Sequence, residues 1–79
     1  MPYIRHEVRD ALDAGRYNPR SAGELTYTIY RDALTLLGRA PTFSDYAEVI
    51  GAIEAAKMEI YRRLVAPYED KKIKEHGDI

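Results

Sequence analysis

A long run of regularly spaced apolar side chains dominates the second half of this sequence and limits the folds open to it. Between residues 46 and 64 these side chains recur mostly at intervals of three or four positions: Tyr46, Val49, Ile50, Ile53, Ile60, Tyr61 and Leu64. This spacing places them on one face of an α-helix roughly 30 Å long. We therefore expect an amphipathic helix here, as the longest and central element of the fold.

Local signals bound this central helix at both ends. Thr42 or Ser44 can cap its start, because a hydroxyl oxygen there accepts a hydrogen bond from a backbone amide of the first turn. Pro67 is expected to end or kink the helix, because proline lacks an amide and crowds the preceding turn. Pro67 could equally open a short final helix that runs to about His76 and is closed by Gly77.

A first helix is expected from about Pro2 to Ala14. Pro2 suits a first helical turn, and Gly15 suits a left-handed C-terminal cap. The apolar positions of this segment follow the rhythm of one helix face: Ile4, Val8, Ala11 and Leu12.

A second helix is expected from Ser21 to Leu37, followed by Gly38. Ser21 and Glu24 have the spacing of a capping box, in which the serine oxygen accepts from the Glu24 amide and the Glu24 side chain accepts from the serine amide. Apolar residues occupy more than one side of this helix. It therefore has more apolar surface than one packing contact would cover.

No segment alternates like a strand, so the fold class is all-α. We expect one domain over residues 1–79, built as a small antiparallel bundle of three main helices plus a short C-terminal helix after Pro67. A chain of 79 residues buries little surface, and small domains compensate with disulfides, metals or partner chains. The sequence has no cysteine, and its two histidines, His6 and His76, are far apart. Partner chains remain, which favours a homodimer.

The charge balance does not favour a nucleic-acid partner, because twelve Lys and Arg face thirteen Asp and Glu. A modest basic cluster near the C-terminus is interleaved with acidic residues: Arg62, Arg63, Lys71, Lys72 and Lys74. Glu59 lies three and four positions before the two arginines, the spacing of helical ion pairs. No apolar run is long enough for a membrane span, and no signal peptide is recognisable, so a cytoplasmic protein is expected.

Lys57 is the most informative single residue, because its position falls within the apolar face of the central helix. A buried ammonium group needs a partner, and Glu54 on the next turn or Asp32 on the second helix could supply one. We expect Lys57 and Asp32 to form a buried polar pair. Lys57 would then be a structural residue whose stem lies along the core, rather than a nucleophile with a lowered pKa.

Seven tyrosines against one phenylalanine and no tryptophan form an unusual aromatic composition. Tyrosine combines a large apolar ring with a hydroxyl that can stay hydrated at the edge of an interface, and so suits protein interfaces. Tyr46 and Tyr61 fall on the face of the central helix and are expected to be structural. The candidate interface residues are Tyr27, Tyr30, Leu34 and Tyr68.

No constellation of catalytic residues stands out, and no cofactor is expected. Glu48, Glu54 and Glu59 are six and five positions apart, which sends their carboxylates to different sides or different turns of one helix. A small-residue patch on the central helix can pack within the chain or across a two-fold axis: Gly51, Ala52, Ala55 and Ala56.

Three stretches of the C-terminal half are distinctive: Gly51 to Arg63, Ala66 to Ile73 and Gly77-Asp78, together with residues 2–4 and 23–27 nearer the N-terminus. In these stretches, and so over most of its length, the chain resembles a family of short bacterial and phage proteins that constitute a domain of unknown function. The resemblance implies no reaction, cofactor or catalytic residue. It does draw attention to residues 67–70, where we expect Tyr68, Glu69 and Asp70 to fold back on the helical body, near Arg62 or Arg63.

These observations favour a non-enzymatic, self-associating helical interaction or regulatory module. Two alternatives stay open. The first is a small metal-dependent nucleotide hydrolase assembled across a dimer, which would need carboxylates from two chains to converge. The second is a regulator that touches nucleic acid through Arg62, Arg63 and the lysine-rich tail.

Overall fold

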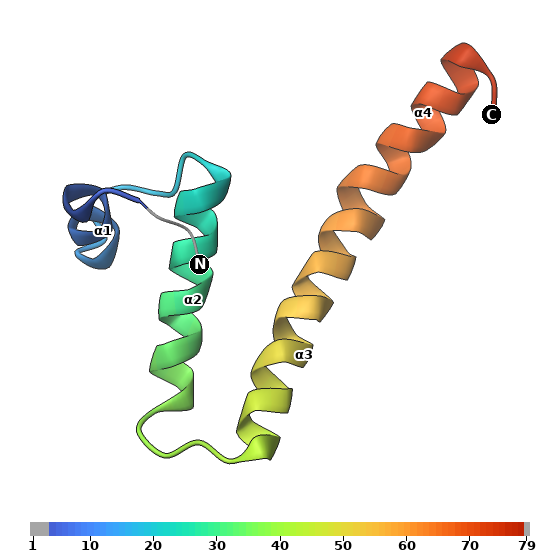
Figure 1. Cartoon of the computed structure of the whole chain (residues 1–79). Coiled ribbons are helices and arrows are strands. Elements are labelled where there is room, and N and C mark those ends of the chain that lie inside the picture. Colours follow the sequence, from blue (N-terminus) through green and yellow to red (C-terminus); the bar gives the residue numbers. More distant parts are fainter. Residues whose placement is uncertain (1–3, 79) are drawn as a thin grey trace. The chain divides into compact units, whose positions relative to one another are not determined.

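Figure 1 shows a computed structural model of the chain, which describes residues 4–78. All regular elements among these residues are helices, so the all-α fold class is confirmed. The chain divides into two compact units, Met1–Pro41 and Thr42–Ile79, which are described separately below. The antiparallel arrangement expected for a bundle of all the helices stays a prediction.

Unit 1 begins with α1, which spans His6–Asp13. The helix starts later than expected: Arg5 has an extended backbone, and no side chain caps the first turn. Pro2, the expected first-turn residue, lies outside the described residues. Ile4, which was expected on the helix face, precedes the helix. Its β-branched side chain gives it a weaker helical preference, and nothing at the local level compensates for this.

The end of α1 matches the expectation. Gly15 has a φ of +69°, and the amides of Gly15 and Arg16 donate to the carbonyls of Leu12 and Ala11 at 3.1 and 2.9 Å. This is the hydrogen-bond pattern of a Schellman motif, which requires a left-handed residue after the helix and therefore favours glycine.

The second helix of unit 1, α2, spans Ala22–Leu37 and ends at Gly38, as expected. The Ser21 hydroxyl accepts from the Glu24 amide at 3.1 Å. The second half of the predicted capping box is wrong: the Glu24 carboxylate accepts from the Arg20 amide at 3.0 Å instead of the Ser21 amide. The acceptor oxygen thus satisfies an amide one residue earlier, which extends the cap into the preceding loop.

Unit 2 begins with α3, which spans Phe43–Ile60. Of the two candidate caps, Thr42 occupies the position. Its hydroxyl accepts from the Asp45 amide at 3.3 Å, and the Asp45 carboxylate accepts from the Thr42 amide at 2.8 Å. This reciprocal capping box fixes the first turn.

The expected break at Pro67 is absent, because α3 continues into a five-residue π-helical turn, η1, over Tyr61–Val65, and then into α4 over Ala66–His76. The Ala66 amide donates to the Tyr61 carbonyl, five residues back. This wider turn accommodates a proline that has no amide and would crowd a regular turn. The other expectation for Pro67 is confirmed: it lies in the first turn of α4, which ends at His76 and is followed by Gly77 with a φ of +84°.

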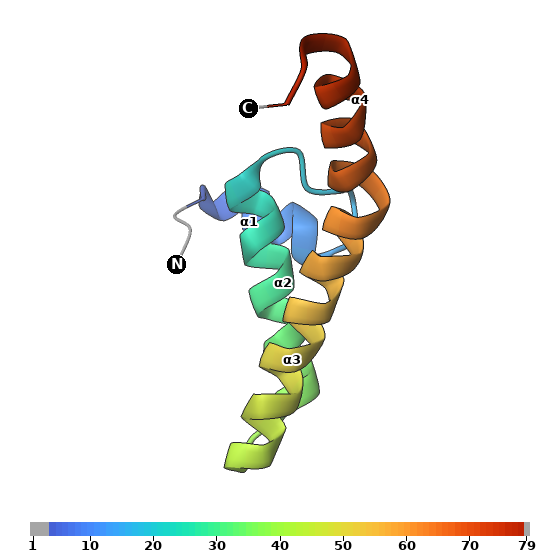
Figure 2. The same cartoon turned by 90° about the vertical axis from the view of Figure 1, so that its right-hand side faces the viewer.

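The predicted fold-back of residues 68–70 is therefore wrong. Tyr68, Glu69 and Asp70 lie within α4, in a helix that runs without interruption from Phe43 to His76, as Figures 1 and 2 show. Below, this continuous helix is called the rod. Among the described residues, no helix combines the length and the apolar character needed to cross a bilayer.

Candidate interaction surface

The rod of unit 2 exposes most of its apolar side chains. It contains 34 residues and is therefore about 50 Å long. A single helix has no interior, and every residue from Ile50 to Val65 is exposed. Ile50, for example, is 66% exposed, although the sequence pattern places it on a core face. Val49 is the one side chain of the rod that is buried among the described residues.

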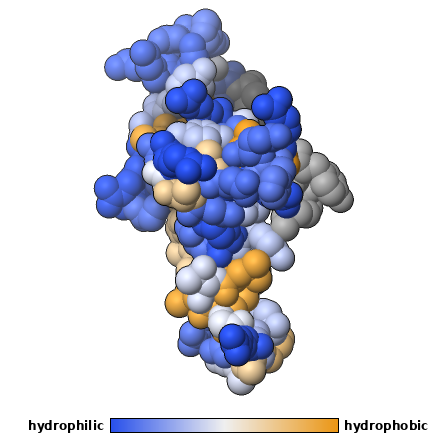
Figure 3. All heavy atoms as spheres, turned by 90° about the vertical axis from the view of Figure 1, so that its left-hand side faces the viewer, coloured by the Kyte–Doolittle hydropathy of each residue, from blue (hydrophilic) through white to orange (hydrophobic). Residues whose placement is uncertain are grey.

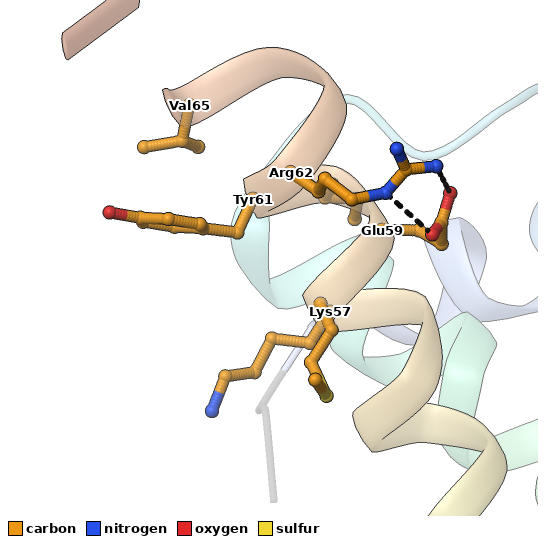
Figure 4. A pocket seen from close by; sticks show the side chains of 7 residues that line it. Lys57, Glu59, Tyr61, Arg62 and Val65 are labelled. Atoms are coloured by element: carbon orange, nitrogen blue, oxygen red, sulfur yellow. Dashed lines mark hydrogen bonds and ion pairs between the residues drawn. The ribbon is translucent and has the colours of Figure 1, made fainter. Parts of the chain in front are cut away.

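Six side chains define what is called the apolar stripe below: Tyr46, Ile50, Ile53, Ile60, Tyr61 and Val65. A groove of about 530 Å³ lies on the rod near η1, and Met58, Ile60, Tyr61 and Val65 supply its apolar lining. Figure 4 shows Lys57, Tyr61 and Val65 pointing to the same side of the helix, while Arg62 and Glu59 point to the other. All residues that line the groove belong to the rod, so the groove is open on its outer side. A side chain of a partner can enter it from there.

The π turn changes which residues share a face. The Tyr61 hydroxyl donates to the Glu69 carboxylate at 2.5 Å across eight positions. In a regular α-helix these residues would point about 80° apart, whereas a turn that absorbs one extra residue brings them to within about 20°. The same shift separates Leu64 from Tyr61, since Leu64 lines another hollow with Ile60. The regular spacing that grouped Leu64 with Tyr61 does not hold beyond η1, and Val65 takes its place.

Lys57 pairs within its own helix. Its Nζ lies 3.2 Å from Glu54 Oε1, and its side chain is 74% exposed. Asp32 is also exposed, and its carboxylate lies 3.1 Å from Arg31 Nη2. Glu54 was one of the two partners considered for Lys57. The predicted pair of Lys57 with Asp32 would join the two units, and it stays a prediction.

Tyr27 takes part in a contact within unit 1. Its hydroxyl donates to the Asp13 carboxylate at 2.9 and 3.0 Å, which raises the pKa of Tyr27 because the carboxylate holds the phenolic proton. Arg31, one turn further along α2, donates from Nη1 to the Leu12 carbonyl at 2.8 Å and to Asp13 at 3.3 Å. Together these bonds hold the C-terminal end of α1 against α2, and Leu12 is only 4% exposed there.

The other three candidate interface residues are exposed in the structure. Tyr30 is 44% exposed and Leu34 is 49% exposed, on α2. Tyr68 is exposed on α4, with the Lys72 ammonium 5.5 Å from the centre of its ring. Figure 3 shows the side of unit 1, where apolar side chains are exposed in the lower part of the view. These three side chains are therefore accessible to a partner, and their role in an interface stays a prediction.

The charges of the rod are distributed unevenly along its length. Residues 43–56, called the acidic half below, carry three carboxylates and no cation: Asp45, Glu48 and Glu54. Residues 62–76, the basic half, carry five cations against three carboxylates: Arg62, Arg63, Lys71, Lys72 and Lys74 against Glu69, Asp70 and Glu75. The two ends of the rod therefore have net charges of opposite sign.

The predicted ion pairs of Glu59 are confirmed. Its carboxylate lies 3.2 Å from Arg62 Nε and 2.6 Å from Arg63 Nε. The two guanidinium groups favour the ionised carboxylate and lower the pKa of Glu59. Within residues 4–78, no group of three potential metal ligands comes together.

The fold and surface define a class of small all-helical protein in which a long amphipathic helix leaves its apolar stripe exposed. The whole chain, residues 1–79, matches the family model described as a domain of unknown function, DUF6899, and the protein belongs to that family. No curated protein and no solved structure shows significant similarity to the chain.

Proposed function

We propose that this protein is a non-enzymatic helical interaction module that self-associates through the apolar stripe of its rod. The observation that supports this most strongly is the exposure of the stripe along a helix of 34 residues. The longest helix of unit 1, α2, has 16 residues and is less than half as long as the rod. In no arrangement can α2 cover the rod from end to end.

The energy available from the stripe is sufficient for association. Fully burying one large apolar side chain contributes about 1.5–3 kcal/mol, so covering the exposed part of six such side chains contributes on the order of 7 kcal/mol per chain. The two chains of a dimer together gain about 14 kcal/mol, from which several kcal/mol of lost translational and rotational freedom must be subtracted, and a micromolar complex corresponds to a net of about 8 kcal/mol. The surface therefore suits a homodimer that forms in the micromolar range, and Tyr30, Leu34 and Tyr68 would add further contacts or bind an unidentified protein partner.

The proposal includes a cytoplasmic setting, as part of a bacterial or phage system. A chain without cysteine cannot rely on disulfides and suits a reducing compartment. The resemblance of its C-terminal half to short bacterial and phage proteins supports the same setting. In such a system the module would act as an adaptor or regulator through the contacts it makes.

Sedimentation velocity of the full chain from low to high micromolar concentration tests the proposal. We expect a reversible monomer–dimer equilibrium, and Ile50→Ser should weaken it at least tenfold, because a polar side chain then occupies the stripe. Ala52→Ser is the matched control: Ala52 is also exposed and projects about 160° away from Ile50 around the same helix. A chain that stays monomeric throughout this range contradicts the proposal.

A further inference from the structure

We infer that two copies of this chain pair with their rods antiparallel, so that the acidic half of each rod lies beside the basic half of the other. This inference rests on the proposed self-association and adds the orientation of the partner. A two-fold axis then passes close to residues 59 and 60, the midpoint of Phe43–His76.

The distribution of charge favours this orientation over the parallel one. In a parallel pair, three carboxylates of one acidic half face three of the other, and the two cationic ends also repel each other. In the antiparallel pair both ends become attractive. Helix dipoles add to the preference, because the positive N-terminus of each rod lies beside the negative C-terminus of the other in the antiparallel pair, whereas like ends lie together in the parallel pair.

Several of the charges concerned have no ion-pair partner in the part of the chain that the structure describes. Among residues 4–78, no ion pair involves Glu48, Lys71 or Lys74, whereas Lys57, Glu59 and Lys72 each have at least one on their own helix. Around an axis at residues 59 and 60, Glu48 of one copy lies level with Lys71 of the other, and Asp45 with Lys74. Since Glu48 projects away from the stripe, the attraction acts over a distance and depends on ionic strength.

The shape of the stripe fits the same axis. The apolar groove beside η1 lies near the middle of the rod, lined by Tyr61 and Val65 among others. A two-fold axis there places the groove of one copy against the groove of the other, so that Tyr61 of each chain can fill the groove of its partner. A surface that contacts its own copy in this way is what an isologous dimer requires.

Spin-label distances measure the orientation directly. The chain has no cysteine, so a single Ser44→Cys substitution accepts one label at an exposed position near the start of the rod. In the antiparallel dimer the two labels are separated by about 31 residues along the axis, or roughly 45 Å. In a parallel dimer they lie within about 20 Å of each other, because packed helices are 8–10 Å apart. A label at Ala56→Cys is the control, since it gives a short distance in both orientations.

The sign of the salt dependence gives a second, independent readout in the same sedimentation experiment. Antiparallel pairing weakens as salt screens the attraction, whereas parallel pairing strengthens as salt screens the repulsion. Glu48→Lys should weaken the dimer severalfold at low salt, and the double variant Glu48→Lys with Lys71→Glu should restore it. A dimer with a short Ser44 distance, or one that tightens with salt, overturns the antiparallel orientation but leaves self-association standing. A monomer under all conditions overturns both, and capture of a different partner by a monomeric chain would then identify another occupant of the stripe.

Discussion

Arg31 connects the two helices of unit 1 by a charged contact at a helix end. Its guanidinium donates to the Leu12 carbonyl, one of the last carbonyls of α1, and also reaches Asp13. A cation at this end of a helix interacts favourably with the partial negative charge of the last carbonyls. The pKa of Arg31 is raised, mainly because Asp32 and then Asp13 accept hydrogen bonds from it, so the guanidinium stays positively charged.

Replacement of Arg31 by alanine should therefore loosen α1. We expect amide hydrogen exchange in residues 8–13 to become at least severalfold faster in Arg31→Ala, while exchange in α3 stays unchanged. Arg39→Ala, an exposed arginine in the connection after α2, is the matched control and should leave α1 as protected as in the native chain. Equal protection of α1 in both variants would show that the Arg31 contact contributes nothing.

The sequence could not have predicted this contact. Arg31 and Leu12 are 19 positions apart, and no local pattern relates them. The one indication of the contact in the sequence is that Arg31 follows Tyr27 by one turn while Asp13 lies at the end of α1. The caps, in contrast, were predictable, because Thr42 contacts a group three residues away, and Gly15 is required by the backbone of its own turn.

At the scale of the element, η1 explains why the rod continues past Pro67. A proline in a regular helix costs about 3 kcal/mol, and this cost is the reason for expecting a break there. Besides ending or kinking at a proline, a helix can take up one extra residue in a wide turn and continue. The turn over Tyr61–Val65 does this. Periodicity alone cannot predict such a turn, since the spacing of residues 46–61 carries no information about the residues that follow it.

Pro67→Ala tests whether the proline maintains the wide turn. With an amide restored at position 67, the five residues of η1 should relax to regular α-helix, and residues 68–76 should rotate by about 100° relative to α3. Tyr61 would then lose its hydrogen bond to Glu69, which at present raises the pKa of Tyr61.

NMR titration of Tyr61 reports this loss. The Tyr61 pKa should fall toward its ordinary value in Pro67→Ala, while Glu75→Gln, an exposed change in α4, should leave it raised. The raised pKa means that the bond stabilises the rod below about pH 10 and ceases to do so as the pH rises through the pKa of Tyr61. An unchanged Tyr61 pKa in Pro67→Ala would show that the wide turn has another cause.

At the scale of the whole molecule, the described residues contain little core. Leu12 and Val49 are the buried hydrophobic residues among them, while the rod exposes its stripe over most of its length. The burial of apolar surface is the main favourable term in folding, so a single copy has little to offset the entropy of an ordered chain. That a small chain without disulfides needs a partner stays a prediction, and the exposed stripe is the surface on which such a partner would bind.

If the dimer supplies much of the stability, the melting temperature must depend on protein concentration. A tenfold rise in concentration favours a folded dimer over two unfolded chains by about 1.4 kcal/mol. For a folding unit of about 160 residues, 1 kcal/mol shifts the Tm by about 2–4 °C, so the Tm should rise by about 3–6 °C per tenfold increase. Calorimetry over a hundredfold range measures this, with Ala52→Ser expected to follow the same slope as the native chain. A Tm that does not change over that range would mean that one copy is stable without a partner, and the exposed stripe would then need a different explanation.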